Sequence, residues 1–150
     1  GVNVFEDLCE EPGFRDFVCM YIGEGTKKKR NEVALGTSDP TVVALAARWI
    51  IRLSNREVRY TLQYHADQDP DQLVAFWSDL LGAAPELFSL QRKSNSNSMT
   101  GRIWRSRYGV LTVRSSDTYL RARIQAWMDL VRGDWGRVSG SSSMPRHEAD

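Results

Sequence analysis

The sequence predicts an α+β fold in which helices cover one face of a sheet of amphipathic strands. Several segments repeat apolar residues at three- and four-residue spacing, which is typical of helices packed on a core. Other segments alternate apolar and polar residues, as strands with one buried face do. The length of 150 residues, with 41% hydrophobic and 26% charged side chains, fits one globular domain.

Helices and strands alternate along most of the chain. The expected order is a helix over 11–24, a strand over 32–37, a helix over 41–54, a strand over 57–66, a helix over 72–81, strands over 87–93 and 102–115, and a last helix that Asp117 caps.

The first helix places Phe14, Phe17, Val18 and Tyr21 on one face, and Gly25 ends it. The lysine-rich run that follows is expected to form a turn. The short strand after this turn again alternates apolar and polar residues, which gives it one buried face.

Two Asp-Pro pairs mark the starts of the middle helices. Ser38 or Asp39 can cap the second helix, and Pro40 suits its first position. The strand over 57–66 has the clearest alternation, with an apolar face and a face of hydrogen-bonding side chains. Asp69 then caps the helix that follows.

The second half of the chain predicts two more strands and a helix. The strand over 87–93 alternates again, and the polar run over 94–101 is expected to be a mobile loop. The strand over 102–115 is expected to break near Gly109. We interpret the Ser-Ser-Asp run that ends at Asp117 as a helix cap rather than as catalytic groups.

Residues 1–136 are expected to form one domain, and the Gly/Ser-rich residues 137–150 a flexible tail. Cys9 and Cys19 are too few for a disulfide scaffold or a zinc site, which favours a reducing cytoplasm. Because the chain begins with Gly1 rather than Met, we expect it to be a piece of a longer protein.

The net charge of +1 hides a separation of charge. Residues 87–116 contain no acid, and a second basic run spans 27–30. The basic residues of the acid-free segment are Arg92, Lys93, Arg102, Arg105, Arg107 and Arg114. This segregation favours a partner rich in phosphate over a merely solvated surface.

The most informative motif ends the first helix. Small residues at Cys19 and Gly23, four positions apart, share one helix face, and Glu24 and Gly25 follow them. Small residues at this spacing allow a second helix to approach closely. Such packing would place the Glu24 carboxylate, which lies between two glycines, at the end of the helix pair.

This motif resembles that of the LAGLIDADG homing endonucleases. Gly25 matches the final glycine, Glu24 the acidic metal ligand, and Gly23 and Cys19 the small contact positions. The Tyr-Ile-Gly-Glu-Gly-Thr-Lys sequence and the Thr-Ser-Asp-Pro cap are similar to the bacterial branch of that family. The resemblance spans about residues 14–131.

The resemblance implies an antiparallel β-saddle backed by helices and a homodimer formed through the motif helices. It implies sequence-specific binding of double-stranded DNA in the bacterial cytoplasm, on the nucleoid. Each subunit contributes one carboxylate to bind Mg²⁺ or another divalent cation, which activates hydrolysis of a phosphodiester. Members of the branch often carry an N-terminal helix-turn-helix segment, which this chain would lack.

The resemblance assigns Glu24 as a catalytic metal ligand, Arg114 as a catalytic cation near the scissile phosphate, and Cys19 and Gly23 to the dimer interface. The residues expected to contact DNA are Lys27, Lys28, Lys29, Arg30, Arg59, Gln63, Gln91, Lys93, Arg105 and Arg107. Two alternatives remain open: a non-catalytic DNA-binding transcription regulator on the same fold, and a dimerisation module with an incidental basic face.

Overall fold

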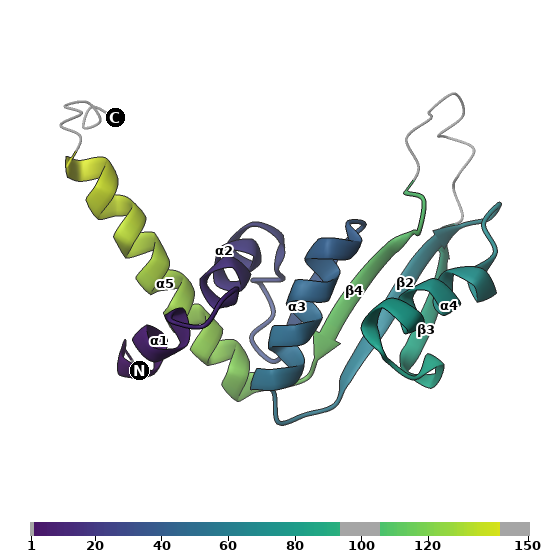
Figure 1. The fold of residues 1–150 in the computed structure, drawn as a ribbon, viewed down its shortest axis with the longest axis horizontal. Coiled ribbons are helices and arrows are strands. Elements are labelled where there is room, and N and C mark those ends of the chain that lie inside the picture. Colours follow the sequence, from purple (N-terminus) through teal and green to yellow (C-terminus); the bar gives the residue numbers. More distant parts are fainter. Residues whose placement is uncertain (1, 94–105, 142–150) are drawn as a thin grey trace.

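A four-stranded sheet with helices packed against it confirms the α+β class (Figure 1). This computed structural model describes residues 2–93 and 106–141. Its elements are α1 (Val2–Cys9), α2 (Phe14–Glu24), β1 (Val33–Thr37), α3 (Pro40–Leu53), β2 (Val58–His65), α4 (Pro70–Leu81), the short 3₁₀ helix η1 (Pro85–Leu87), β3 (Phe88–Lys93), β4 (Val110–Ser115) and α5 (Thr118–Ser141). The main elements follow one another in the predicted order, with α1 added at the start.

The sheet is mixed rather than wholly antiparallel. Its strand order is β1-β4-β2-β3, and β4 is antiparallel to both of its neighbours. Strand β3 runs parallel to β2, so the expectation of an antiparallel sheet is wrong at this edge. The connection explains the difference, because α4 and η1 carry the chain back to the end of the sheet where β2 began. A crossover of this kind joins parallel strands.

Side-chain caps start the middle helices where the sequence predicts them. Asp39 accepts a hydrogen bond from the Thr41 N–H at 2.9 Å, and Asp69 accepts one from the Asp71 N–H at 3.0 Å. Gly82 ends α4 in the left-handed conformation, with φ 62°. Both predicted helix starts are therefore confirmed.

Helix α1 has no counterpart among the predicted elements. An isolated helix of this length is marginal in water. Its Phe5 is buried and packs edge-on against Phe14 of α2, with ring centroids 6.0 Å apart. Contact of Phe5 with the core through the neighbouring helix α2 therefore stabilises α1.

The predicted tail, 137–150, begins inside helix α5, which continues to Ser141. Asp134 forms an ion pair with Arg15 of α2, 3.4 Å apart, and a second with Arg137 one turn further along α5. These pairs favour the helix where two glycines weaken it. The remainder of the predicted tail lies outside the described residues.

The core lies between the helices and one face of the sheet. Leu35, Val113 and Tyr60 are neighbours in the strand register, and all are buried. Trp49 of α3 and Trp77 of α4 belong to the same buried cluster. Helices α3 and α4 therefore cover the same side of the sheet (Figure 1).

Asp117 joins three parts of the chain at the start of α5. Its Oδ1 accepts a hydrogen bond from the Leu120 N–H at 2.9 Å, which confirms the predicted cap. Its Oδ2 accepts hydrogen bonds from the Ser54 hydroxyl at 2.8 Å and the Asn55 N–H at 3.1 Å. Burial alone would raise the pKa of Asp117, but these bonds and the nearby charge of Arg56 hold it below its usual range.

We expect Asp117→Asn to lower the free energy of unfolding at pH 7 by about 1–2 kcal/mol, because the neutral amide accepts weaker hydrogen bonds. A pKa lowered by folding stabilises the protein above the unfolded value near about 3.9, and this stabilisation is lost as pH falls through the folded value. In urea unfolding, the difference in free energy of unfolding between the wild-type chain and Asp117→Asn should therefore become smaller towards acidic pH. Asp79→Asn, at an exposed position on α4, is the control. A difference that stays constant with pH would contradict this role.

Candidate nucleic-acid interface

One face of the sheet gathers polar residues from three strands. Arg59 of β2 lies opposite Arg114 of β4, and Gln63 of β2 lies opposite Gln91 of β3. We call this surface the polar face. It comprises Arg59, Thr61, Gln63 and His65 of β2, Ser89, Gln91 and Lys93 of β3, Val110, Thr112 and Arg114 of β4, and Ala34 and Gly36 of β1.

The polar face contrasts with the buried face in both exposure and charge. Its side chains are exposed or half-buried, except for Ala34, whereas Leu62 and Leu111 on the other face are fully buried. Within the described strands, none of its positions is acidic. The strands therefore hold cations and hydrogen-bonding groups in fixed rows, an arrangement that suits base edges and phosphates.

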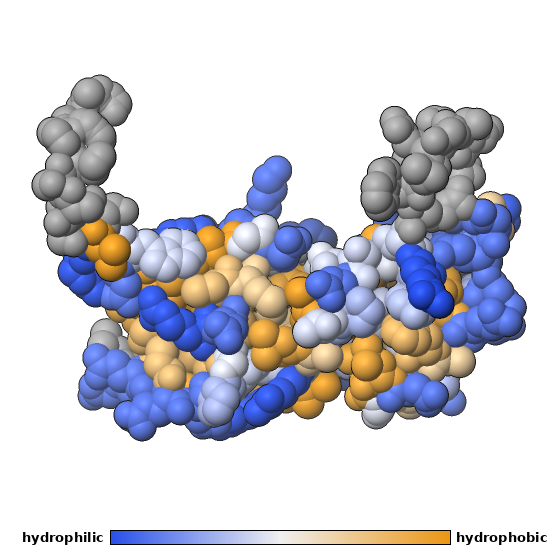
Figure 2. Space-filling view, turned by 45° about the horizontal axis from the view of Figure 1, so that its top comes forward, coloured by the Kyte–Doolittle hydropathy of each residue, from blue (hydrophilic) through white to orange (hydrophobic). Residues whose placement is uncertain are grey.

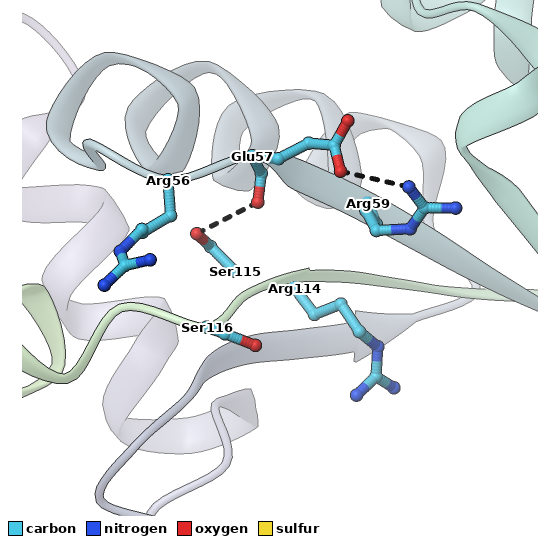
Figure 3. A pocket seen from close by; sticks show the side chains of 6 residues that line it. All are labelled: Arg56, Glu57, Arg59, Arg114, Ser115 and Ser116. Atoms are coloured by element: carbon cyan, nitrogen blue, oxygen red, sulfur yellow. Dashed lines mark hydrogen bonds and ion pairs between the residues drawn. The ribbon is translucent and has the colours of Figure 1, made fainter.

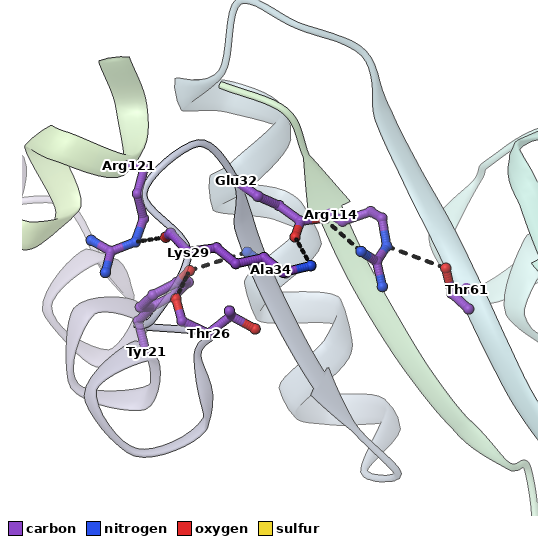
Figure 4. A network of polar contacts seen from close by, with 8 residues as sticks. All are labelled: Tyr21, Thr26, Lys29, Glu32, Ala34, Thr61, Arg114 and Arg121. Atoms are coloured by element: carbon purple, nitrogen blue, oxygen red, sulfur yellow. Dashed lines mark hydrogen bonds and ion pairs between the residues drawn. The ribbon is translucent and has the colours of Figure 1, made fainter. Parts of the chain in front are cut away.

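Arg114 is held in one direction by two contacts (Figure 4). Its Nη1 lies 2.5 Å from the Glu32 carboxylate, and its Nε donates to the Thr61 hydroxyl at 3.2 Å. Glu32 also pairs with Lys29, 3.6 Å away. The Arg114 charge is therefore partly balanced, while the side chain stays at the polar face.

A buried arginine anchors the basic turn, residues 27–30. Arg121 of α5 is fully buried, and its guanidinium donates to the backbone carbonyl groups of Lys27 at 2.8 Å and Lys29 at 3.2 Å. Figure 4 shows the contact with Lys29. It also donates to the Gln125 side chain at 3.2 Å. Carbonyl oxygens thus satisfy a buried charge that would otherwise be costly.

Tyr21 fixes the chain between α2 and β1. Its hydroxyl donates to the Thr26 carbonyl at 2.9 Å and accepts from the Ala34 N–H at 3.1 Å. Burial raises the pKa of this hydroxyl, although the Ala34 bond and the charge of Arg121 oppose the rise. A Cβ at Gly25 would lie 2.3 Å from the Tyr21 ring, so only glycine lets the chain pass so closely.

The predicted catalytic carboxylate stands at the end of α2. Glu24 is exposed, and no described residue forms a hydrogen bond or ion pair with it. Gly23 is exposed and Cys19 is half-buried on the same helix. A Cβ added to Gly23 would meet nothing within 4 Å, so α2 is open at this position, whereas Cys19 packs partly against the core.

Across residues 2–93 and 106–141, no group of three or more His, Cys, Asp or Glu side chains could hold a metal ion. Mg²⁺ usually takes one or two carboxylates together with substrate phosphates and waters. Glu24 is exposed, so its carboxylate is accessible to such a cation.

The remaining predicted DNA contacts belong to the basic turn and to the segment that precedes β4. Lys28, Lys29 and Arg30 are exposed, whereas Lys27 is half-buried and donates to the Gly25 carbonyl at 2.9 Å.

Near the start of β4, Arg107 is exposed, with its guanidinium 5.4 Å from the ring centre of Tyr108. The turn here is fixed by Gln68, whose side chain donates to the Ser106 carbonyl at 2.9 Å. Arg105 lies outside the described residues.

Three residues at or near the candidate interface were not predicted from the sequence. Arg121 follows Leu120 of the apolar stripe of α5, and a charge within such a stripe is a usable signal of a buried role. Arg56 lies in the connection before β2, where no periodicity predicts the direction of a side chain, and Glu32 directly precedes β1. Only the folded chain brings them to the polar face.

Exposed hydrophobic residues are spread over the molecule. On the face drawn in Figure 2, hydrophobic patches are broken by hydrophilic residues. In the part of the chain that the structure describes, the large exposed apolar side chains are Val4, Ile51, Leu80 and Leu90, and on α5 Tyr119, Trp135 and Val138. Single residues of this kind are ordinary on protein surfaces. Among the described helices, none is long and apolar enough to cross a membrane.

No protein-family model, curated protein or solved structure matches this chain. Function is therefore inferred from the chemistry of the polar face and of the residues around it.

Replacing Arg121→Met should leave two buried carbonyl groups without a donor and loosen the basic turn. We expect the free energy of unfolding to fall by about 2–4 kcal/mol. Backbone hydrogen exchange over residues 26–34 should accelerate more than exchange in β2. Arg123→Met is the matched control on the same helix, because Arg123 stacks on the Trp127 ring, 4.8 Å from its centre. Equal effects of the two variants on the basic turn would rule out the anchor.

Proposed function

We propose that the chain binds double-stranded DNA with its polar face and cleaves it as a LAGLIDADG-type homodimer. The observation that carries the DNA-binding part is the exposed polar face, where cations and amides from neighbouring strands stand in register. A DNA major groove admits a two-stranded ribbon, and base edges are read by side chains of these types.

Within the polar face, the amides and the guanidinium groups suit different bases. Gln63 and Gln91 are direct neighbours, and a glutamine amide can bind adenine through two hydrogen bonds. Arg59 is exposed, and an arginine can bind guanine in the same two-point manner. Sequence preference would therefore come from these three side chains.

Phosphate contacts come from the basic residues at the edges of the polar face. Lys28, Lys29 and Arg30 belong to a turn whose backbone Arg121 anchors, so they need little ordering when DNA binds. Lys93 ends β3, and Arg107 precedes β4. Contacts of this kind position the duplex and make binding weaken as salt rises.

The homodimer supports cleavage by bringing two carboxylates together. Two α2 helices packed through Cys19 and Gly23 would place the Glu24 side chains at the same end of the pair. Those two carboxylates would hold the divalent cation, which when bound supplies Lewis-acid stabilisation of charge on phosphate oxygens. Arg114, held by Glu32 and Thr61, would add a fixed positive charge near the scissile phosphate.

The direct test exposes the chain to a randomised duplex library with Mg²⁺ or with a chelator, and sequences the bound and cut products. We expect cleavage at a defined site with metal only, and a loss of at least about 100-fold in Glu24→Gln with affinity nearly unchanged. Asp16→Asn, an exposed carboxylate on the same helix, should cut normally. Specific, salt-sensitive binding without cutting under any divalent cation would instead support a regulator. Absence of duplex binding would reject the whole proposal.

The dimer interface has its own test. Gly23→Leu should leave the fold of one chain intact, because a Cβ there meets nothing within 4 Å. It should weaken the dimer by about tenfold or more, since a bulky side chain would separate the helices. Light scattering across a concentration series measures this, and Gly136→Leu on α5 is the control, because its Cβ also meets nothing within 4 Å. If the wild-type chain is monomeric both with and without DNA, this interface is ruled out.

A further inference from the structure

A cavity of about 260 Å³ opens at the end of the polar face where β4 ends and β2 begins (Figure 3). It is lined by Arg56, Glu57, Arg59, Arg114, Ser115 and Ser116. Pockets for drug-sized ligands usually hold roughly 300–1,000 Å³, so this one suits a more compact group.

The lining of this cavity is strongly positive. Arg56, Arg59 and Arg114 contribute three positive charges and Glu57 one negative charge, an excess of +2. Glu32 pairs with Arg114, but Lys29 pairs with Glu32 in turn. The lining itself therefore keeps its positive excess, although the nearby Asp117 carboxylate, which lies outside the lining, interacts with the charge of Arg56.

Arg56 is the cation of this cavity that is most available to a ligand. It is exposed in the connection between α3 and β2, and no described carboxylate forms an ion pair with it. Figure 3 shows its side chain across the cavity from those of Arg59 and Arg114, with Ser115 and Ser116 between them. The guanidinium groups of Arg56 and Arg59 point away from each other in this view, so both would turn inward to contact an anion in the cavity.

The ion pair already present in the cavity is easily replaced. Arg59 lies 3.0 Å from Glu57, but both side chains are about half exposed or more, at 49% and 63%. Exposed pairs of this kind contribute little to stability. A phosphate that accepts two parallel hydrogen bonds from the guanidinium forms a stronger contact, so it can displace the carboxylate.

We propose that this cavity binds a phosphomonoester group. A phosphomonoester carries about −1.5 to −2 charges near pH 7, which matches the excess of +2, and it presents three free oxygens to the arginines. A backbone phosphodiester carries a single charge and is flanked by ester groups on two sides. The group could belong to a DNA end, in which case the inference rests on the proposed DNA binding, or to a free mononucleotide.

The test is an NMR titration of the full chain, following the amide signals of Ser115 and Ser116. The first probe is inorganic phosphate, and we expect saturable shifts. Arg56→Gln should weaken phosphate binding about tenfold or more, and Glu57→Gln should strengthen it about two- to fivefold. Arg132→Gln, an exposed arginine paired with Asp129 on α5, should change nothing. No saturation at millimolar phosphate, or equal effects of Arg56→Gln and Arg132→Gln, would overturn the proposal.

Two further arms identify the source of the group. One compares duplexes with 5′-phosphate and 5′-hydroxyl ends, and the other compares a nucleoside 5′-monophosphate with the nucleoside. Tighter binding of the phosphorylated member, lost in Arg56→Gln, supports the cavity and shows which source it takes. Duplex binding that ignores the end group, without phosphate binding, rejects the cavity and leaves the proposed function standing. Phosphate binding without duplex binding supports the cavity and rejects the proposed function.

Discussion

The buried guanidinium of Arg121 makes the interaction on which the position of the basic turn depends. It connects α5 to the chain between α2 and β1 through two backbone carbonyl groups. Those contacts hold the turn that carries the lysines, and Tyr21 holds the residues on either side of it. One charge at the end of the sequence thereby fixes the position of many charges near its beginning.

Charges at the polar face are organised in pairs rather than left as an open positive field. Arg59 faces Glu57, and Arg114 faces Glu32. These carboxylates come from connections, not from the strands themselves. They keep the guanidinium groups extended and directed before any anion arrives, which lowers the ordering cost of binding. Because the pairs are partly exposed to solvent, an incoming phosphate can replace the carboxylate as the partner of the arginine.

The sequence predicted those features of the fold that local chemistry determines. The alternation over β2 placed Arg59 and Gln63 on one face, because side chains of a strand alternate strictly. The Asp-Pro pairs located the starts of α3 and α4. The direction of β3 was not predictable in this way, since it depends on where α4 packs after leaving β2. The same holds for Arg56, whose direction is set by the folded connection around Asp117 and not by any periodicity.

The position of β4 in the middle of the sheet has a consequence for how the chain folds. Strands β1 and β2 do not pair with each other, and both rely on β4, which comes much later in the sequence. A chain emerging from a ribosome therefore carries two unpaired strand edges until its last third has been made. Pairing over such sequence distances slows folding, because the entropy of closing a long loop is lost before the strand contacts form. The final strand and helix are thus the pieces that complete the domain, and a nascent chain stopped before them is a natural substrate for chaperones or proteases.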